Sequence, residues 1–342
     1  MGRLQLPNVQ LPFDVDALLA RRWVRITLYA VFFVFCFLLF AYWSFPYHRL
    51  RDYIIRQVEH PAGSGGRQAS GWKLDIVDLS PSWGTGVTLS GVQLARVPDD
   101  PNETAVPMSI EELTVRMSPL ALLFGTTGAS FAAEMGGGEM DGSFAHSEER
   151  TAVEGDVENV DLGQVRAAQA FLGIPIAGVM GGRLDFTIAE DPQDTNGELE
   201  LSVAGLEIGN SRAKLKVEGM SDGLTIERID AGDLSMRIVA EEGVARITEL
   251  QSEGKDATLR GTGTIRLLKP LEMSRLDTVF RISFQDGYRN RSDQTRALFS
   301  LMEFNPEMRA ARTPDDALQW RVSGSFGGRM TPAPAGKTKL PD

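Results

Sequence analysis

The chain has 342 residues, a formal net charge of −11 and 42% hydrophobic residues. Residues 1–60 are basic, so the acidic excess lies in the remainder, which argues against nucleic acid and against broad adhesion to anionic lipid headgroups. The single cysteine, Cys36, lies in an apolar run, so the rest of the chain has neither disulfides nor thiolate chemistry. The length beyond residue 46 suits one large domain or two ordinary ones.

The first predicted element is a membrane-spanning helix. Residues 26–45 form an uncharged, mostly apolar run, and a helix of that length covers about 30 Å, the thickness of the bilayer hydrocarbon. Trp and Tyr residues lie towards both ends of the run, where the headgroup layer favours them. The sequence therefore predicts a transmembrane signal-anchor helix over 23–46, in contact with a lipid bilayer.

A cleavable signal peptide is the competing interpretation of this run. Its apolar region would be about 7–15 residues long and would end in small residues, whereas here a longer run ends in Ser44, Phe45 and Pro46. Arginines flank both ends, so the charge rule alone does not decide the orientation. A short tail ahead of a long exported domain is the simplest insertion, which places residues 1–22 in the cytoplasm.

Residues 47–70 are predicted to form a membrane-proximal helix and a flexible joint. Leu50, Ile54, Ile55 and Val58 recur at helical spacing, and a Pro- and Gly-rich stretch follows at 61–66. From residue 71 the apolar period changes to two, which is typical of antiparallel strands with one solvated face. The predicted strands cover 72–76, 87–94, 110–117, 151–157, 184–188, 199–203, 213–217, 224–229, 234–239, 244–250, 258–267, 278–284 and 319–326.

These strands predict a mainly β fold: an elongated, curved, largely antiparallel sheet in a periplasmic domain over 71–328. Short helices are expected at 118–124, 162–172 and 292–303, the last capped by Ser292. The pairs Asn196-Gly197 and Asp222-Gly223 predict tight turns, and Gly136-Gly137-Gly138 with Asp141-Gly142 predicts a flexible hairpin connection. Residues 329–342 are predicted to be a disordered tail.

No pattern of residues indicates catalysis, and the sequence predicts no catalytic, cofactor-binding or metal-binding residue. The three histidines, His48, His60 and His146, lack the spacing of metal ligands and the motif of a nucleophilic serine. Gly336-Lys337-Thr338 resembles the end of a phosphate loop but lacks its earlier glycine, strand and helix. Adjacent acidic pairs are interpreted as solvated turn charges: Asp99-Asp100, Glu148-Glu149, Glu241-Glu242 and Asp315-Asp316.

The alternating apolar face of the sheet leaves two interpretations open. If a helix or a second sheet covers this face, the face is an ordinary hydrophobic core, which is the default for a soluble domain. A face that stays open is instead a long apolar trough able to hold acyl chains, although exposed apolar patches on soluble proteins are normally small.

Several segments together resemble a known family. They are Trp83–Leu94 (WGTGVTLSGVQL), Ser118–Gly125 (SPLALLFG), Phe171–Gly178 (FLGIPIAG) and Gly182–Phe186 (GRLDF), all beyond the apolar run. This combination resembles protein N of the type II secretion system, the general secretion pathway, in its δ-proteobacterial form. A later segment, Gly254–Pro270, resembles the AsmA-like family of β-rich proteins anchored in the inner membrane.

The first resemblance implies a non-catalytic, single-pass protein of the bacterial inner membrane with a large C-terminal domain in the periplasm. Such a protein would assist assembly or coupling of the machinery that exports folded proteins, with inner- and outer-membrane secretion subunits as partners. The AsmA-like resemblance implies a different function, the binding or conduction of phospholipid along an apolar groove. A third class, a periplasmic hydrolase, requires a convergent polar pocket that the sequence does not indicate.

Overall fold

A computed structural model describes the chain in two compact units, residues 1–50 and 51–342. The described residues are 22–44, 46–59, 72–82, 85–96, 108–118, 121, 125–165, 174–210, 214–215, 224–225, 227–269, 273–326 and 330–338. Residues 1–21 of the tail predicted at 1–22, residues 60–70 of the segment predicted at 47–70 and the Asp222-Gly223 turn lie outside the described residues, as do most of the predicted helices at 118–124 and 162–172.

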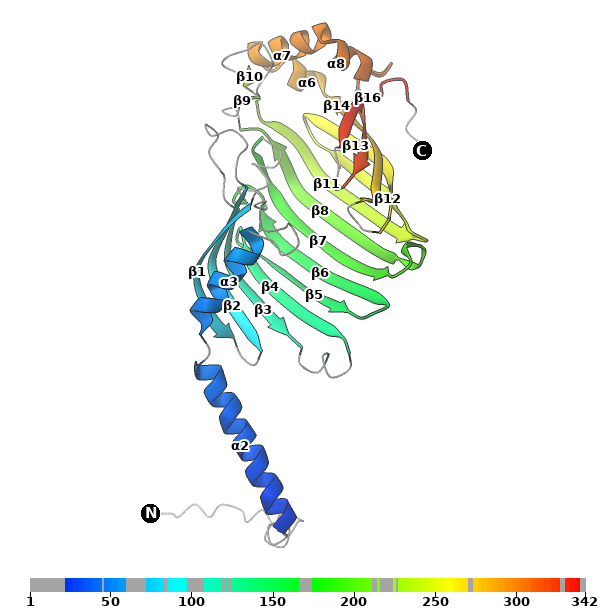
Figure 1. The fold of residues 1–342 in the computed structure, drawn as a ribbon. Coiled ribbons are helices and arrows are strands. Elements are labelled where there is room, and N and C mark those ends of the chain that lie inside the picture. The colour runs from blue at the N-terminus through cyan, green and yellow to red at the C-terminus, as the bar shows by residue number, and fades with distance from the viewer. Residues whose placement is uncertain are drawn as a thin grey trace, which may run out of the picture. The chain divides into compact units, whose positions relative to one another are not determined.

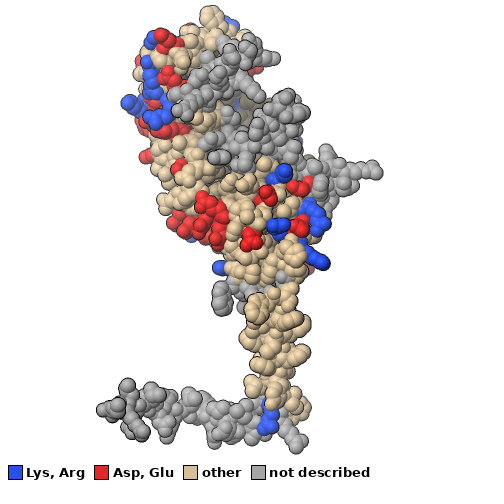
Figure 2. Space-filling view, turned by 90° about the vertical axis from the view of Figure 1, so that its left-hand side faces the viewer, with Lys and Arg blue, Asp and Glu red and all other residues tan. Residues whose placement is uncertain are grey.

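The first unit contains helix α2 (Arg22–Ser44), and helix α3 (Tyr47–Glu59) begins in it. Large apolar side chains of α2 are highly exposed, for example Phe33 at 72% and Val34 at 53%. Figure 2 shows no charged side chain along the middle of this helix. A search of the described residues finds no helix with the length and hydropathy needed to cross a membrane. The predicted anchor therefore stays a prediction.

The second unit is built on one antiparallel sheet of 14 strands, which confirms the mainly β, antiparallel fold. Each strand pairs with the next described strand of the sheet in sequence, and Figure 1 shows the sheet bending along its length. The strands are β1 (Trp72–Ser82), β2 (Gly86–Arg96), β3 (Met108–Met117), β4 (Thr127–Met135), β5 (Gly138–His146), β6 (Arg150–Asp161), β7 (Ile176–Ala189), β8 (Asn196–Ile208), β11 (Ile229–Glu241), β12 (Val244–Glu253), β13 (Ala257–Arg266), β14 (Arg275–Phe284), β15 (Leu318–Ser325) and β16 (Thr331–Pro334).

Three short elements lie between strands of the large sheet in the sequence. The 3-10 turn η1 (Pro192–Asp194) connects β7 to β8. Strands β9 (Lys214–Leu215) and β10 (Leu224–Thr225) pair with each other as a separate two-stranded sheet. The strands predicted at 213–217 and 224–229 are observed at 214–215 and 224–225, and the long strand β11 starts at Ile229. Residues 213, 216, 217 and 226 lie outside the described residues.

The hairpin predicted at 136–138 is confirmed, but the strands that it joins, β4 and β5, are not among the predicted strands, and Asp141-Gly142 lies inside β5. Gly136 and Gly137 have positive φ angles of 60° and 71°, the backbone conformation of a tight hairpin turn. The strands on either side carry many small residues, so their alternation is weak. Pairing with β3 on one side and β6 on the other forms both strands despite this weak local signal.

Two other predictions are also wrong. Asn196 and Gly197 do not form a turn: they begin β8, where Gly197 is paired with Phe186, because η1 makes the connection instead. Part of the predicted disordered tail is strand β16, which pairs with β15. Beyond it, the buried Gln319 amide donates to the carbonyl oxygen of Ala335 at 2.9 Å, so the chain is held there after the strand ends.

Three helices lie at one end of the strands: α6 (Asp286–Arg289), α7 (Asp293–Phe304) and α8 (Pro306–Ala311). The prediction of a helix capped by Ser292 is confirmed, because the Ser292 hydroxyl accepts from the backbone N–H of Thr295 at 3.1 Å. Tyr288 packs with Ile229 and Ala257, and Phe299 of α7 lies against this cluster. The helices are thus attached to the sheet by an apolar core at the strand ends.

Candidate functional site

One face of the 14-stranded sheet carries no charged side chain along three rows of paired residues, and we call it the uncharged face. Paired residues of antiparallel neighbours point to the same side, so the strand register identifies each row. The first row crosses every strand: Pro81, Val87, Val115, Phe131, Gly142, Gly155, Leu184, Leu199, Ile238, Ile247, Gly263, Thr278, Val322 and Pro332.

The two rows that flank the first one also contain no charged side chain. One comprises Met117, Ala129, Phe144, Val153, Phe186, Gly197, Ala240, Ala245, Ile265, Leu276 and Gly324. The other comprises Leu79, Leu89, Leu113, Ala133, Met140, Val157, Gly182, Leu201, Met236, Leu250, Gly261, Phe280, Trp320 and Pro334. The apolar surface is therefore continuous across the sheet.

The opposite face is charged. Arg183 on β7 lies 3.4 Å from Asp156 on β6, and Arg237 on β11 pairs with Glu198 and Glu200 on β8. At the far end of the sheet, hydrogen bonds from the Arg321 guanidinium lower the pKa of the Asp277 carboxyl. Such cross-strand ion pairs on an exposed surface contribute little stability each, but they keep this face solvated.

Much of the uncharged face is accessible. Phe131 and Phe144 are 37% and 41% exposed, and most other large side chains of the rows are half-buried. The only other sheet that the described residues form is the small β9–β10 pair. No second layer of comparable size covers the rows within that part of the chain, so a sandwich core is not the arrangement there.

Glycines shape this face by making room for neighbouring rings. A Cβ on Gly142 would lie 2.7 Å from the ring of Phe131, and a Cβ on Gly197 would lie 2.6 Å from the ring of Phe186. Each ring therefore lies over a glycine of the next strand instead of standing upright, an arrangement known to stabilise glycine in sheets. The result is a smooth apolar surface at these two positions.

The residues considered for chemistry in the sequence are not brought together. His146 is exposed at the end of β5, with Nδ1 2.9 Å from the Thr151 hydroxyl, and His48 is exposed on α3. His60 lies outside the described residues. No group of three potential ligands gathers at one point among the residues that the structure describes.

One acidic pair is misinterpreted in the sequence analysis. Asp315 and Asp316 are not merely solvated: Asp315 pairs with Arg281, and Asp316 pairs with both Arg289 and Arg312. Arg281 and Arg289 are distant from the two acids in sequence, and Arg312 follows helix α8, whose position depends on the sheet. The adjacency of the two acids therefore does not indicate these partners. The only signal for these pairs in the sequence is the arginine content of 281–312.

Comparisons with known proteins add no assignment. No family model matches the chain, no curated protein matches it, and no solved structure has a significant similarity to it. The fold and the uncharged face define a class, a long open antiparallel sheet with one apolar and one charged surface. Function must be inferred from that surface.

Proposed function

We propose that the uncharged face binds acyl chains, so that the protein holds or conducts lipid along its sheet. The observation that carries this proposal is the first row, which crosses all 14 strands without a charged side chain. Strands lie about 4.8 Å apart, so 14 strands provide roughly 60 Å of apolar surface along the curve of the sheet. Each methylene that leaves water contributes about 0.8 kcal/mol, so such a surface binds aliphatic chains without specific contacts.

We further propose that α2 anchors the chain in the bacterial inner membrane, with the β domain in the periplasm. The support is the uncharged run at 26–45 together with the exposure of its apolar side chains. Through this anchor the bilayer is both a partner and a source of lipid.

A second candidate function is the non-catalytic role in the type II secretion pathway. Its support is the set of segments from Trp83–Leu94 to Gly182–Phe186, which resemble protein N of that pathway. Among the strands that the structure describes, β1 has a paired neighbour on one side only, so its other edge offers backbone groups to a strand of another subunit. Assembly of the export machinery and lipid binding are compatible, but they predict different partners.

The two functions are tested by one experiment. The protein is crosslinked in its native membrane and purified, and mass spectrometry identifies both the bound proteins and the bound lipids. Phospholipid at a stoichiometric level, lost when Leu199 is replaced by Glu, is the result expected for the lipid function. Recovery of secretion subunits without enriched phospholipid would overturn it in favour of the second candidate.

A further inference from the structure

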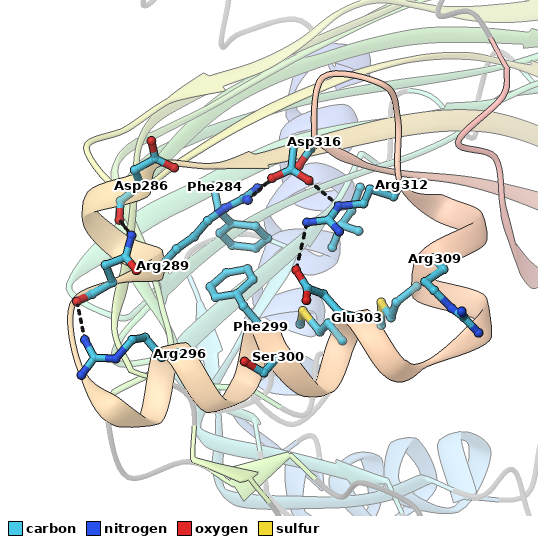
Figure 3. Close-up of a pocket in the computed structure, with 14 residues that line it drawn as sticks. Phe284, Asp286, Arg289, Arg296, Phe299, Ser300, Glu303, Arg309, Arg312 and Asp316 are labelled. Carbon is cyan, nitrogen blue, oxygen red and sulfur yellow. Dashed lines mark hydrogen bonds and ion pairs between the residues drawn. The ribbon is translucent and has the colours of Figure 1, made fainter.

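A pocket of about 380 Å³ lies where the uncharged face meets the three helices, and we call it the cap pocket. Phe284 and Leu318 line it, and both point to the uncharged face, because they are two residues away from Ile282 and Trp320 on that face. The apolar surface therefore continues into the pocket. Figure 3 shows Phe284 and Phe299 at its centre.

The rest of the lining is rich in arginine. The lining contains four arginines and three carboxylates, although the chain as a whole is acidic. The arginines are Arg289, Arg296, Arg309 and Arg312, and the carboxylates are Asp286, Glu303 and Asp316. Arg296 also pairs with Asp293, outside the lining, so the charges balance here, and the distinctive feature is a gathering of guanidinium groups beside the end of an apolar surface. An amphiphile with an anionic head matches both parts.

The arginines are held in position but are not fully used. Arg289 lies over the ring of Phe299, 5.4 Å from its centre, and donates to Asp316, while its buried Nε has no hydrogen-bond partner among the described residues. Arg312 is shared between Asp316 and Glu303, the latter at 3.4 Å (Figure 3). Arg309 has no carboxylate within ion-pair distance among the described residues.

We propose that the cap pocket binds the phosphate of an anionic phospholipid whose acyl chains lie on the uncharged face. The inference rests on the proposed lipid function and adds the headgroup class. The planar guanidinium of Arg312 would donate two hydrogen bonds to phosphate oxygens in place of its long contact with Glu303. Ser300 and Asn290, which also line the pocket, supply neutral hydrogen-bonding groups for the remainder of a headgroup.

The test measures binding of lipids with identical acyl chains to the full chain in detergent. Wild type is expected to bind phosphatidylglycerol about tenfold more tightly than diacylglycerol, the effect of one charge-assisted contact. The double variant Arg309→Gln/Arg312→Gln should lose this preference and keep its affinity for diacylglycerol. Arg246→Gln on the charged face removes the same kind of charge elsewhere and should keep the preference.

A gain of binding guards against misfolding of the double variant. Glu303→Gln releases Arg312 from its competing carboxylate at an exposed position, so affinity for phosphatidylglycerol should rise severalfold. Equal affinity of wild type for both lipids, or a preference that survives in the double variant, overturns the headgroup proposal and leaves the lipid function standing. Absence of binding to either lipid overturns both.

Inorganic phosphate distinguishes the two sources of the anion. Titrated alone, it should show no saturable binding at millimolar concentration, because a single phosphate lacks the chains that hold it in place. Saturable phosphate binding that Arg312→Gln abolishes, with no preference between the two lipids, would assign the pocket to free phosphate and overturn the phospholipid proposal.

Discussion

Leu184 on β7 and Leu199 on β8 face each other on one side of the sheet, while Arg183 and Glu200, one residue away on each strand, lie on the other. Both leucines are half-buried, so neither is part of a closed core. A shift of one residue in register would exchange the apolar and charged surfaces. The pairing of these two residues is therefore what separates a lipid-binding face from a solvated face.

Replacing both leucines by asparagine tests this separation. We expect the free energy of unfolding to fall by only about 1–2 kcal/mol, since the positions are half exposed, as chemical denaturation would measure. Binding of a fluorescent fatty acid should weaken at least about tenfold, because each acyl chain would then lie against unpaired amides. Glu200→Gln on the charged face is the control and should bind normally. Unchanged binding in the double variant would contradict a role for this face.

The anchor proposal predicts the fractionation of a charged variant. Replacing Phe33 and Val34 by arginine costs about 2.5–3.5 kcal/mol of insertion free energy for each residue near the helix centre. We expect the variant to leave the membrane pellet on alkaline carbonate extraction, while wild type stays in it. Leucine at both positions should behave as wild type. Retention of the arginine variant in the pellet would argue that α2 does not span the bilayer.

Asp316 links α6 to α8 through Arg289 and Arg312, and this predicts a dependence of stability on acid. Burial acts to raise the pKa of the Asp316 carboxyl, but hydrogen bonds from the two arginines outweigh it and lower the pKa. A lowered pKa stabilises the folded state above the unfolded-state pKa of about 3.9, and this stabilisation disappears as the pH falls below it.

Asp316→Asn should therefore reduce the free energy of unfolding by about 1–2 kcal/mol at neutral pH, a range limited by the partial exposure of the pair. Asparagine also tolerates the positive φ of 66° at this position, so the loss would not come from backbone strain. Denaturation curves at pH 7 and pH 3 should show a larger difference from wild type at pH 7 than at pH 3. Glu241→Gln, an exposed hairpin carboxylate, serves as the control.

The raised pKa of Tyr288 predicts that the stability of the fold depends on pH in the alkaline range. Tyr288 is 1% exposed and its hydroxyl donates to the carbonyl oxygen of Glu227 at 3.0 Å, while burial and the charge of Glu227 raise the pKa of Tyr288 to about 12. Below pH 10, Tyr288→Phe should be less stable than wild type by about 1 kcal/mol, the value of the lost hydrogen bond.

Above pH 10 the order of stability of wild type and the phenylalanine variant should change. A tyrosine whose folded-state pKa is raised keeps its proton at a pH where the unfolded chain loses its own, so wild type loses stability as the pH rises from 10 towards 12. The phenylalanine variant has no such group, and its stability should exceed that of wild type near the upper end of this range. Urea denaturation at pH 8 and pH 11.5 measures both differences; parallel curves would contradict the assignment.

Much of the β fold is predictable from local patterns. Strict alternation in segments such as 184–188 and 234–239 specifies strands with one apolar face, because successive side chains of a strand point to opposite sides. Ser292 was also identified as a helix cap, since its short hydroxyl followed by a helical pattern is a local signal. By itself the sequence determined the strand-rich antiparallel class, the uncharged run at 26–45 and the capped helix.

Only the tertiary structure decided the rest. Strands β4 and β5 form because neighbours on both sides supply hydrogen bonds that their small residues do not signal, and β16 forms because β15 is already in place. The register aligned the apolar residues of 14 strands into continuous rows, and the folding of α6–α8 onto the strand ends brought Arg289 to Asp316. Both results depend on contacts between residues far apart in the chain, which local periodicity cannot specify.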